Sequence, residues 1–146
     1  MRITYKGDYA LKSLLDLAIH YKQGLSTIHD IAKRISAPVK FLEQVLLELK
    51  NGGFVESRRG KVGGYLMARA PSQITLGEVV RFIDGPIEPI ACVEKGYAGC
   101  TDIYKCVFRK VWLDVGKCTS EIVDNISFEE LVNRVQVTEG ALAYQI

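Results

Sequence analysis

Three cysteines, Cys92, Cys100 and Cys106, follow one another with the spacing C-x7-C-x5-C. Thiolates on a glycine-containing loop can turn inward on one centre, and soft sulfur ligands favour iron–sulfur clusters, zinc or copper. The spacing matches neither a C-x2-C zinc pair nor a ferredoxin run. Free cysteines are often simply buried, but two of these three lie in a polar loop. We therefore expect metal binding or redox sensing at this segment.

A second set of residues could contact the bases of duplex DNA. Lys40, Glu43 and Gln44 fall in the first two turns of an expected helix, on the face opposite its apolar stripe. Glutamine can form two hydrogen bonds with adenine, and glutamate can accept one from the amino group of cytosine. Lys40 could bind guanine or a phosphate. Each of them taken singly is more often a solvated helix residue, so the interpretation depends on the surrounding elements.

Those elements follow from hydrophobic periodicity and turn signals. Apolar residues recur at helical spacing over residues 28–35, where Thr27 can cap the start, and again over residues 39–50. Two short strands, 54–57 and 64–67, flank a basic tip. The tip residues that could contact phosphate or enter a minor groove are Arg58, Arg59 and Lys61. Helix, tight turn, helix and basic hairpin predict a winged helix-turn-helix that recognises DNA.

The remaining segments predict supporting helices. A core helix over residues 5–21 begins after Gly7-Asp8, where Asp8 can cap the first turn or place a favourable charge there. A long helix over residues 101–126 carries apolar residues at alternating spacings of four and three, the pattern of a helix packed along another helix. Its seam consists of Tyr104, Phe108, Val111, Val115, Cys118 and Ile122. Such a seam beside a small domain predicts a two-fold dimer.

The expected fold class is mainly α with a small β-hairpin, a winged helix-turn-helix followed by a long dimerisation helix. We predict four segments: a DNA-binding domain (1–85), a cysteine-bearing sensor loop (86–101), the dimerisation helix (102–126), and a C-terminal short helix and tail (127–146). Residues 1–70 hold 12 Lys/Arg and 6 Asp/Glu, a net charge of +6, whereas residues 71–146 hold 7 and 11, a net charge of −4. The basic half therefore contains the helix-turn-helix, as contact with phosphate requires.

Composition and motifs exclude several classes of protein. No apolar run approaches the roughly 18 residues that cross a bilayer, and the N-terminus lacks an apolar signal segment. We therefore expect no membrane partner and a cytoplasmic location, where four cysteines argue against structural disulfides. His20 and His29 each stand alone, and there is no nucleophile–base pair or phosphate-binding loop. We expect neither an enzyme nor a small-molecule substrate.

Several stretches resemble the IscR/NsrR/RirA/CymR (Rrf-type) group of bacterial regulators. They are Ile3–Leu11, Phe41–Gln44, the hairpin stretch Arg59–Tyr65 and the triple cysteine, and the similarity extends over residues 1–135. The resemblance implies a homodimeric winged-helix transcription factor that binds a palindromic operator in double-stranded DNA, usually as a repressor.

The same resemblance implies an iron–sulfur cluster on Cys92, Cys100 and Cys106 that senses nitric oxide, redox state or iron. In the IscR branch a histidine follows the third cysteine by three residues, but here that position is Arg109, which cannot bind iron. In the NsrR branch an aspartate near the partner's N-terminus completes a [4Fe–4S] site, and Asp8 stands at the matching place. The resemblance thus favours [4Fe–4S] over [2Fe–2S]. Exposed clusters are labile, so an aerobically prepared sample can lack one.

Two other interpretations stay open at this stage. A clusterless regulator of the same type would sense through disulfides among the three cysteines or through zinc, and an anaerobic iron and sulfide assay would distinguish it. An iron–sulfur electron carrier or cluster-handling protein would need neither a recognition helix nor a basic wing, and a gel shift would distinguish it.

Overall fold

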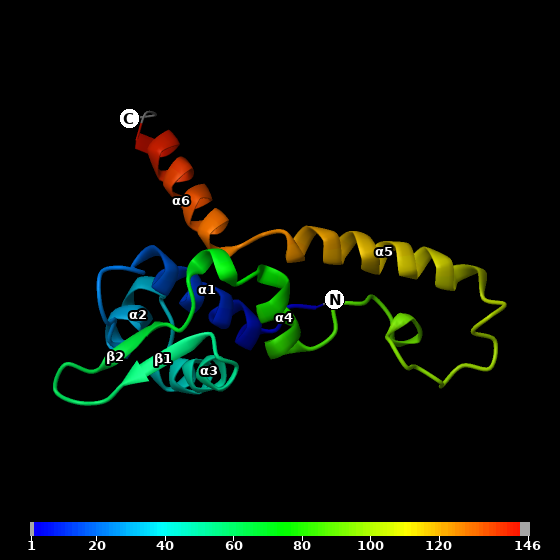
Figure 1. The fold of residues 1–146 in the computed structure, drawn as a ribbon, viewed down its shortest axis with the longest axis horizontal. Coiled ribbons are helices and arrows are strands. Elements are labelled where there is room, and N and C mark those ends of the chain that lie inside the picture. The colour runs from blue at the N-terminus through cyan, green and yellow to red at the C-terminus, as the bar shows by residue number, and fades with distance from the viewer. Residues whose placement is uncertain (1, 144–146) are drawn as a thin grey trace.

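The computed structural model describes residues 2–143 and confirms the predicted fold class, six α-helices with one two-stranded hairpin among the described residues. The elements in order are α1 (Tyr5–Ile19), α2 (Ile28–Ile35), α3 (Val39–Asn51), β1 (Val55–Arg58), β2 (Gly64–Met67), η1 (Pro71–Gln73), α4 (Leu76–Asp84), η2 (Ala91–Val93), α5 (Val107–Asp124) and α6 (Phe128–Ala143). Figure 1 shows α1 to α4 and the hairpin gathered into one body, which we call the N-terminal body (residues 2–85), while α5 and α6 extend from it. No helix in the described part of the chain combines the length and apolar character needed to cross a membrane.

The helices of the body begin where their caps allow. Thr27 precedes α2, and its hydroxyl oxygen accepts a hydrogen bond from the Asp30 N–H at 3.2 Å. Thr75 does the same for α4 with the Glu78 N–H at 3.2 Å. These contacts satisfy N–H groups that a helix start leaves free. α2 therefore begins at the residue that the sequence predicts.

The core lies around α1, which packs against α2, α3, α4, α6 and β2. α3 turns one stripe into this core, formed by Leu42, Val45, Leu46 and Leu49. Because that stripe recurs every three to four residues, the opposite face of α3 must point away from the core. The packing on α1 thus determines which side chains α3 presents to solvent.

The hairpin pairs β1 with β2 in antiparallel register, with Val55 opposite Met67 and Arg58 opposite Gly64. β1 begins one residue later than predicted. Ser26 forms an isolated bridge with Tyr65 and so joins the α1–α2 connection to the edge of β2. A Cβ atom at Gly64 would lie 2.7 Å from the Ser26 carbonyl oxygen, so a side chain there would push the two segments apart.

Two helix starts differ from the sequence predictions. α1 begins after Thr4, whose hydroxyl accepts from the Gly7 N–H at 3.0 Å, so Asp8 does not cap the helix and lies within its first turn. α5 begins at Val107 instead of residue 101. The main-chain N–H groups of Lys105 and Cys106 both bond to the Asp102 carbonyl, which makes a turn that precedes the helix.

The C-terminal helix is also longer than predicted. α6 covers Phe128–Ala143, whereas the sequence indicated a short helix and a loosely held tail. Phe128 is fully buried, and Leu131 and Val132 pack against the core beside it. The end of the expected tail, residues 144–146, lies outside the described residues.

Candidate nucleic-acid interface and cysteine loop

The exposed face of α3 carries the predicted base-contacting residues. Lys40, Glu43 and Gln44 are all exposed, on the side opposite the buried stripe. Leu47 continues the same row one turn later and is 58% exposed. The structure therefore places the three predicted residues together on one open surface, in the first half of the helix, where recognition helices contact base edges.

A partly buried ion pair joins α2 to α1. The guanidinium of Arg34 donates to both carboxylate oxygens of Asp16, from Nε at 2.7 Å and from Nη2 at 2.8 Å, and Nη2 also donates to Ser26 Oγ at 2.9 Å. The Asp16 side chain is only 7% exposed. The hydrogen bond that Arg34 donates to the Asp16 carboxylate raises the pKa of Arg34. This contact was missed by sequence reasoning, because its partners are eighteen residues apart and belong to different helices.

The hairpin places Arg58 and Arg59 beside α3, around a groove that Lys50 also lines. Arg58, Arg59 and Lys61 are exposed at the end of β1 and in the tip. Lys50, near the end of α3, donates from Nζ to Ser57 Oγ at 2.7 Å and so links the helix to the hairpin. Helix and hairpin thus form one positively charged surface that suits the phosphates of DNA.

The three predicted cluster ligands lie along the connection between α4 and α5, which extends away from the N-terminal body (Figure 1). Cys92 is half-buried in η2, Cys100 is exposed in the loop, and Cys106 is exposed directly before α5. All three are free thiols. Within residues 2–143, no three His, Cys, Asp or Glu side chains come together as a metal site. The thiols therefore share one loop but are not gathered around one point.

One hydrogen bond joins the two ends of this loop. Arg109, in the first turn of α5, donates from Nε to the main-chain carbonyl of Cys92 at 3.2 Å. Sequence reasoning recognised Arg109 only as a residue that cannot bind iron. Its contact was missed because the acceptor is a main-chain oxygen, which leaves no mark on the sequence.

Asp8 lies on α1, whereas the three cysteines lie in the connection between α4 and α5. It accepts a hydrogen bond from Lys12 Nζ at 2.6 Å, and this contact raises the pKa of Lys12. Asp8 also lines an open cleft beside the N-terminal segment, together with Arg2, Ile3, Thr4 and Tyr5. No cysteine among residues 2–143 lines that cleft.

The predicted seam of α5 faces solvent. Phe108, Val111, Val115, Cys118 and Ile122 are all exposed, and Phe108 is 65% exposed. Tyr104 is 98% exposed but precedes the helix. The face of α5 turned toward the protein is formed by Gly116 and Val123, and Arg81 of α4 donates from Nη2 to Asp124 Oδ2 at 3.0 Å. An exposed apolar stripe of this length is typical of a surface that binds another protein.

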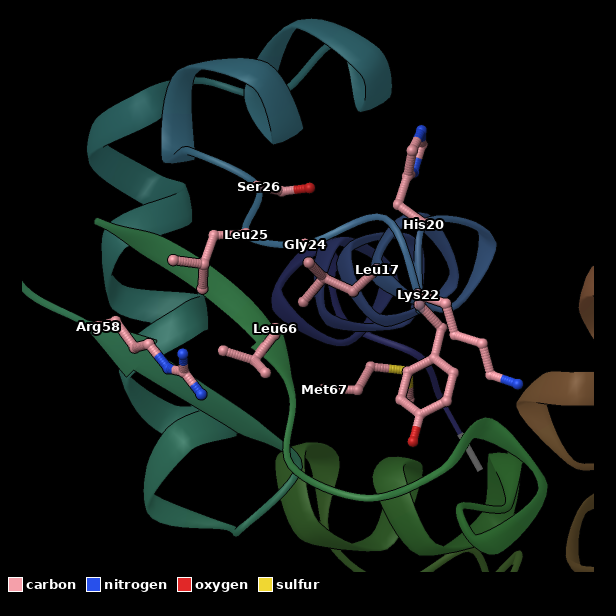
Figure 2. A pocket seen from close by; sticks show the side chains of 10 residues that line it. Leu17, His20, Lys22, Gly24, Leu25, Ser26, Arg58, Leu66 and Met67 are labelled. Atoms are coloured by element: carbon pink, nitrogen blue, oxygen red, sulfur yellow. The ribbon is translucent and has the colours of Figure 1, made fainter. Parts of the chain in front are cut away.

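A small cavity of about 210 Å³ lies between the end of α1, the α1–α2 connection and the hairpin. Its lining is largely apolar, with Leu17, Leu66 and Met67 among the residues around it. Figure 2 shows the side chains of His20 and Lys22 extending away from Leu66 and Met67. Its polar groups do not converge on one point, as catalysis would require.

Comparison with known proteins gives a consistent result. The family model Rrf2, described as an iron-dependent transcriptional regulator, matches residues 3–134. The chain is 33% identical over 141 residues to the HTH-type transcriptional regulator IscR of Pectobacterium carotovorum, covering 97% of this chain and 85% of that one. It is 39% identical over 137 residues to an rrf2-like HTH-type transcriptional regulator of Rhodobacter capsulatus, covering 89% of this chain and 91% of that one.

Solved structures of such regulators share the fold. The global cysteine regulator CymR of B. subtilis superposes with a TM-score of 0.77 at 30% identity, covering 92% of this chain and 98% of that one. IscR of T. potens superposes with a TM-score of 0.71 at 28% identity, covering 92% and 88%. These relatives are transcriptional regulators, in agreement with the prediction that the chain is not an enzyme.

Proposed function

This chain belongs to the Rrf2 family of iron-dependent transcriptional regulators, and we propose that it represses transcription in the cytoplasm by binding a palindromic operator as a homodimer. We further propose that an iron–sulfur cluster on the cysteine loop determines its affinity for the operator. One observation carries the proposal. The loop with three free thiols leads directly into α5, which presents an apolar face to solvent and packs on α4 of the body that carries the surface suited to DNA.

The homodimer is supported by the exposed apolar face of α5. Two copies related by a two-fold axis would bury Phe108, Val111 and Val115 against one another, since a two-fold interface uses the same patch twice. The two α3 helices would then contact successive major grooves, about 34 Å apart. In this proposal residues 1–85 bind DNA, 86–101 form the sensor loop, 102–126 contain the dimer contact and 127–146 complete the chain.

The donor chemistry of the loop fits an iron–sulfur cluster. Cys92, Cys100 and Cys106 are free thiols, which are soft ligands, and all three lie on the connection between α4 and α5. When bound, such a cluster supplies a centre that reacts with nitric oxide or oxygen or is lost when iron is scarce. We propose Asp8 from the second copy as the fourth ligand, which favours the [4Fe–4S] type. Asp8 would then exchange its contact with the Lys12 ammonium for iron.

The chain's own contacts provide the connection between loop and DNA surface. Arg109 holds the Cys92 end of the loop to the first turn of α5. Arg81 and Asp124 join α5 to α4, and α4 packs directly on α1 at the centre of the body. Ordering the loop would therefore bias the position of α5 and, through it, the distance between the two recognition helices of the dimer.

The test compares two cysteine variants prepared anaerobically. The wild type and Cys118→Ser should contain iron and acid-labile sulfide, whereas a variant with serine at Cys92, Cys100 and Cys106 should contain neither. Nitric oxide should change the operator Kd of the first two proteins about tenfold or more, within the usual range of allosteric coupling, and should leave the triple variant unchanged. A triple variant that responds like the wild type would overturn the sensing proposal.

A clusterless mechanism is the second candidate, because Cys100 and Cys106 are exposed free thiols that could oxidise. In that case the anaerobic protein would lack iron. Mass spectrometry would then detect a disulfide among the three cysteines after oxidation, or a bound zinc ion before it.

A further inference from the structure

Leu47 is an apolar side chain on the charged face of α3. It is 58% exposed, whereas Leu42, Leu46 and Leu49 of the same helix are fully buried. Its position completes the row of Lys40, Glu43 and Gln44 at helical spacing. The core of the body is therefore closed without Leu47, and packing within this chain does not explain a leucine at this position.

Leu47 borders a groove of about 260 Å³ between α3 and the hairpin, which Lys50, Ser57, Arg58 and Arg59 also line. With α3 in a major groove and the hairpin tip at the adjacent minor groove, the sugar–phosphate strand that separates the two grooves must pass between helix and hairpin. Lys50 on one wall and Arg58 on the other suit that strand. This places Leu47 on the α3 side of the strand, where the base edges begin.

The major groove offers one apolar group to such a side chain, the 5-methyl group of thymine, since the other exposed groups are hydrogen-bond donors and acceptors. From this placement we infer that Leu47 is a specificity-determining residue that contacts a thymine methyl group in each operator half-site. The inference rests on the proposed DNA-binding function and assigns a base preference to a residue that cannot form a hydrogen bond through its side chain.

The experiment removes only the methyl group from the DNA. Operators are first selected with the wild-type protein from random duplex DNA, and each thymine is then replaced by deoxyuridine. Each half-site should contain one thymine whose replacement, made in that half-site alone, weakens wild-type binding about fourfold. This is the loss expected for one methyl group. Leu47→Ala should bind thymine and deoxyuridine operators equally at that position. Leu47→Met, which stays apolar, should retain a preference for thymine.

Lys50→Gln serves as the matched control, because it changes a neighbouring groove residue that we assign to phosphate. It should weaken binding to thymine and deoxyuridine operators by the same factor and reduce the dependence of log Kd on log salt by about one per half-site. Its deoxyuridine penalty should equal that of the wild type.

Three results would overturn the inference. They are a wild-type protein indifferent to deoxyuridine at every position, a Leu47→Ala variant that keeps the penalty, and a Leu47→Ala variant whose oligomeric state changes while its base preference does not. Selection that yields no operator at all would contradict the DNA-binding function itself, and with it this inference, and it is recognised before any thymine is replaced.

Discussion

The N-terminal body and the arm formed by residues 86–126 differ in how much each buries within a single chain. Nearly all the buried apolar side chains lie in α1 to α4, the hairpin and the start of α6. In the arm, Ile87 and Val123 are the buried apolar side chains among the described residues, while most of the large apolar residues of α5 are exposed. The body buries its own apolar residues, whereas the arm leaves an apolar face exposed to solvent.

Helix starts show the same contrast. The first turns of α1, α2 and α4 are capped by Thr4, Thr27 and Thr75. α5 starts after Cys106 with no side-chain cap among the described residues. Three of the four helices described in the body thus have a side-chain hydrogen bond at their start, whereas α3, which follows Pro38, has none. The arm places a free thiol at the start of its helix. A sensing segment is expected to come from the less stable part of a protein.

The largest stability effect should follow from a change in the core of the body. Leu46→Ala should lower the free energy of unfolding by about 3 kcal/mol, because it leaves a cavity where the side chain was fully buried. The neighbouring change Leu47→Ala should alter it by less than about 0.5 kcal/mol. Urea denaturation followed by circular dichroism measures both values. Equal costs at the two positions would contradict the assignment of inner and outer faces of α3.

A mutation on the apolar face of the arm should change the dimer dissociation constant. Phe108→Ser should raise the dimer dissociation constant about a hundredfold, since about 1.5 kcal/mol is lost in each copy of a two-fold interface. Lys117→Ser, on the same helix but away from the apolar seam, should change it less than about threefold. Sedimentation equilibrium over a dilution series gives both constants. A Phe108→Ser protein that dimerises like the wild type would place the dimer contact elsewhere.

The free energy of unfolding should depend more on a partly buried ion pair of the body than on an exposed ion pair of α6. Asp16→Asn should lower the free energy of unfolding by about 2 kcal/mol, because the Arg34 guanidinium would lose its charged acceptor, a carboxylate that is nearly buried. Glu130→Gln, which removes the exposed contact with Arg134 in α6, should cost less than about 0.5 kcal/mol. Chemical denaturation at low and high salt compares them. The ranking would be wrong if both variants lost the same stability.

The sequence was most informative where a helix buries one face and has a capping residue. The positions of α2 and α3 followed from their apolar stripes, and Thr27 indicated the start of α2. The strand β1 was displaced by one residue, whereas β2 lies where it was predicted. The predicted start of α5 was wrong. The apolar spacing extends back to Tyr104, but that residue lies in a turn held by the Asp102 carbonyl, before the helix begins. Periodicity reports which faces are apolar, but it does not report where helical hydrogen bonds begin.

Contacts between distant segments were beyond sequence reasoning. The Arg34–Asp16 pair and the Arg109–Cys92 contact join residues whose proximity depends on how helices pack. The assignments of cluster ligands, base contacts and dimer residues stay predictions. The face of α3 was predictable, since Lys40, Glu43 and Gln44 had to lie opposite its buried stripe.

The smallest expected effect concerns the hydrogen bond from the Arg109 side chain that holds the Cys92 end of the loop to α5. In metal-free protein, Cys92 should react with iodoacetamide more slowly than Cys100, because it is half-buried whereas Cys100 is exposed. Arg109→Gln should raise the rate at Cys92 about fivefold, as the loss of about 1 kcal/mol from one hydrogen bond implies. The rate at Cys118, on the exposed face of α5, serves as the internal reference and should not change. If Cys92 reacted at its wild-type rate in Arg109→Gln, its protection would come from η2 itself. The order of the loop would then not depend on its contact with α5.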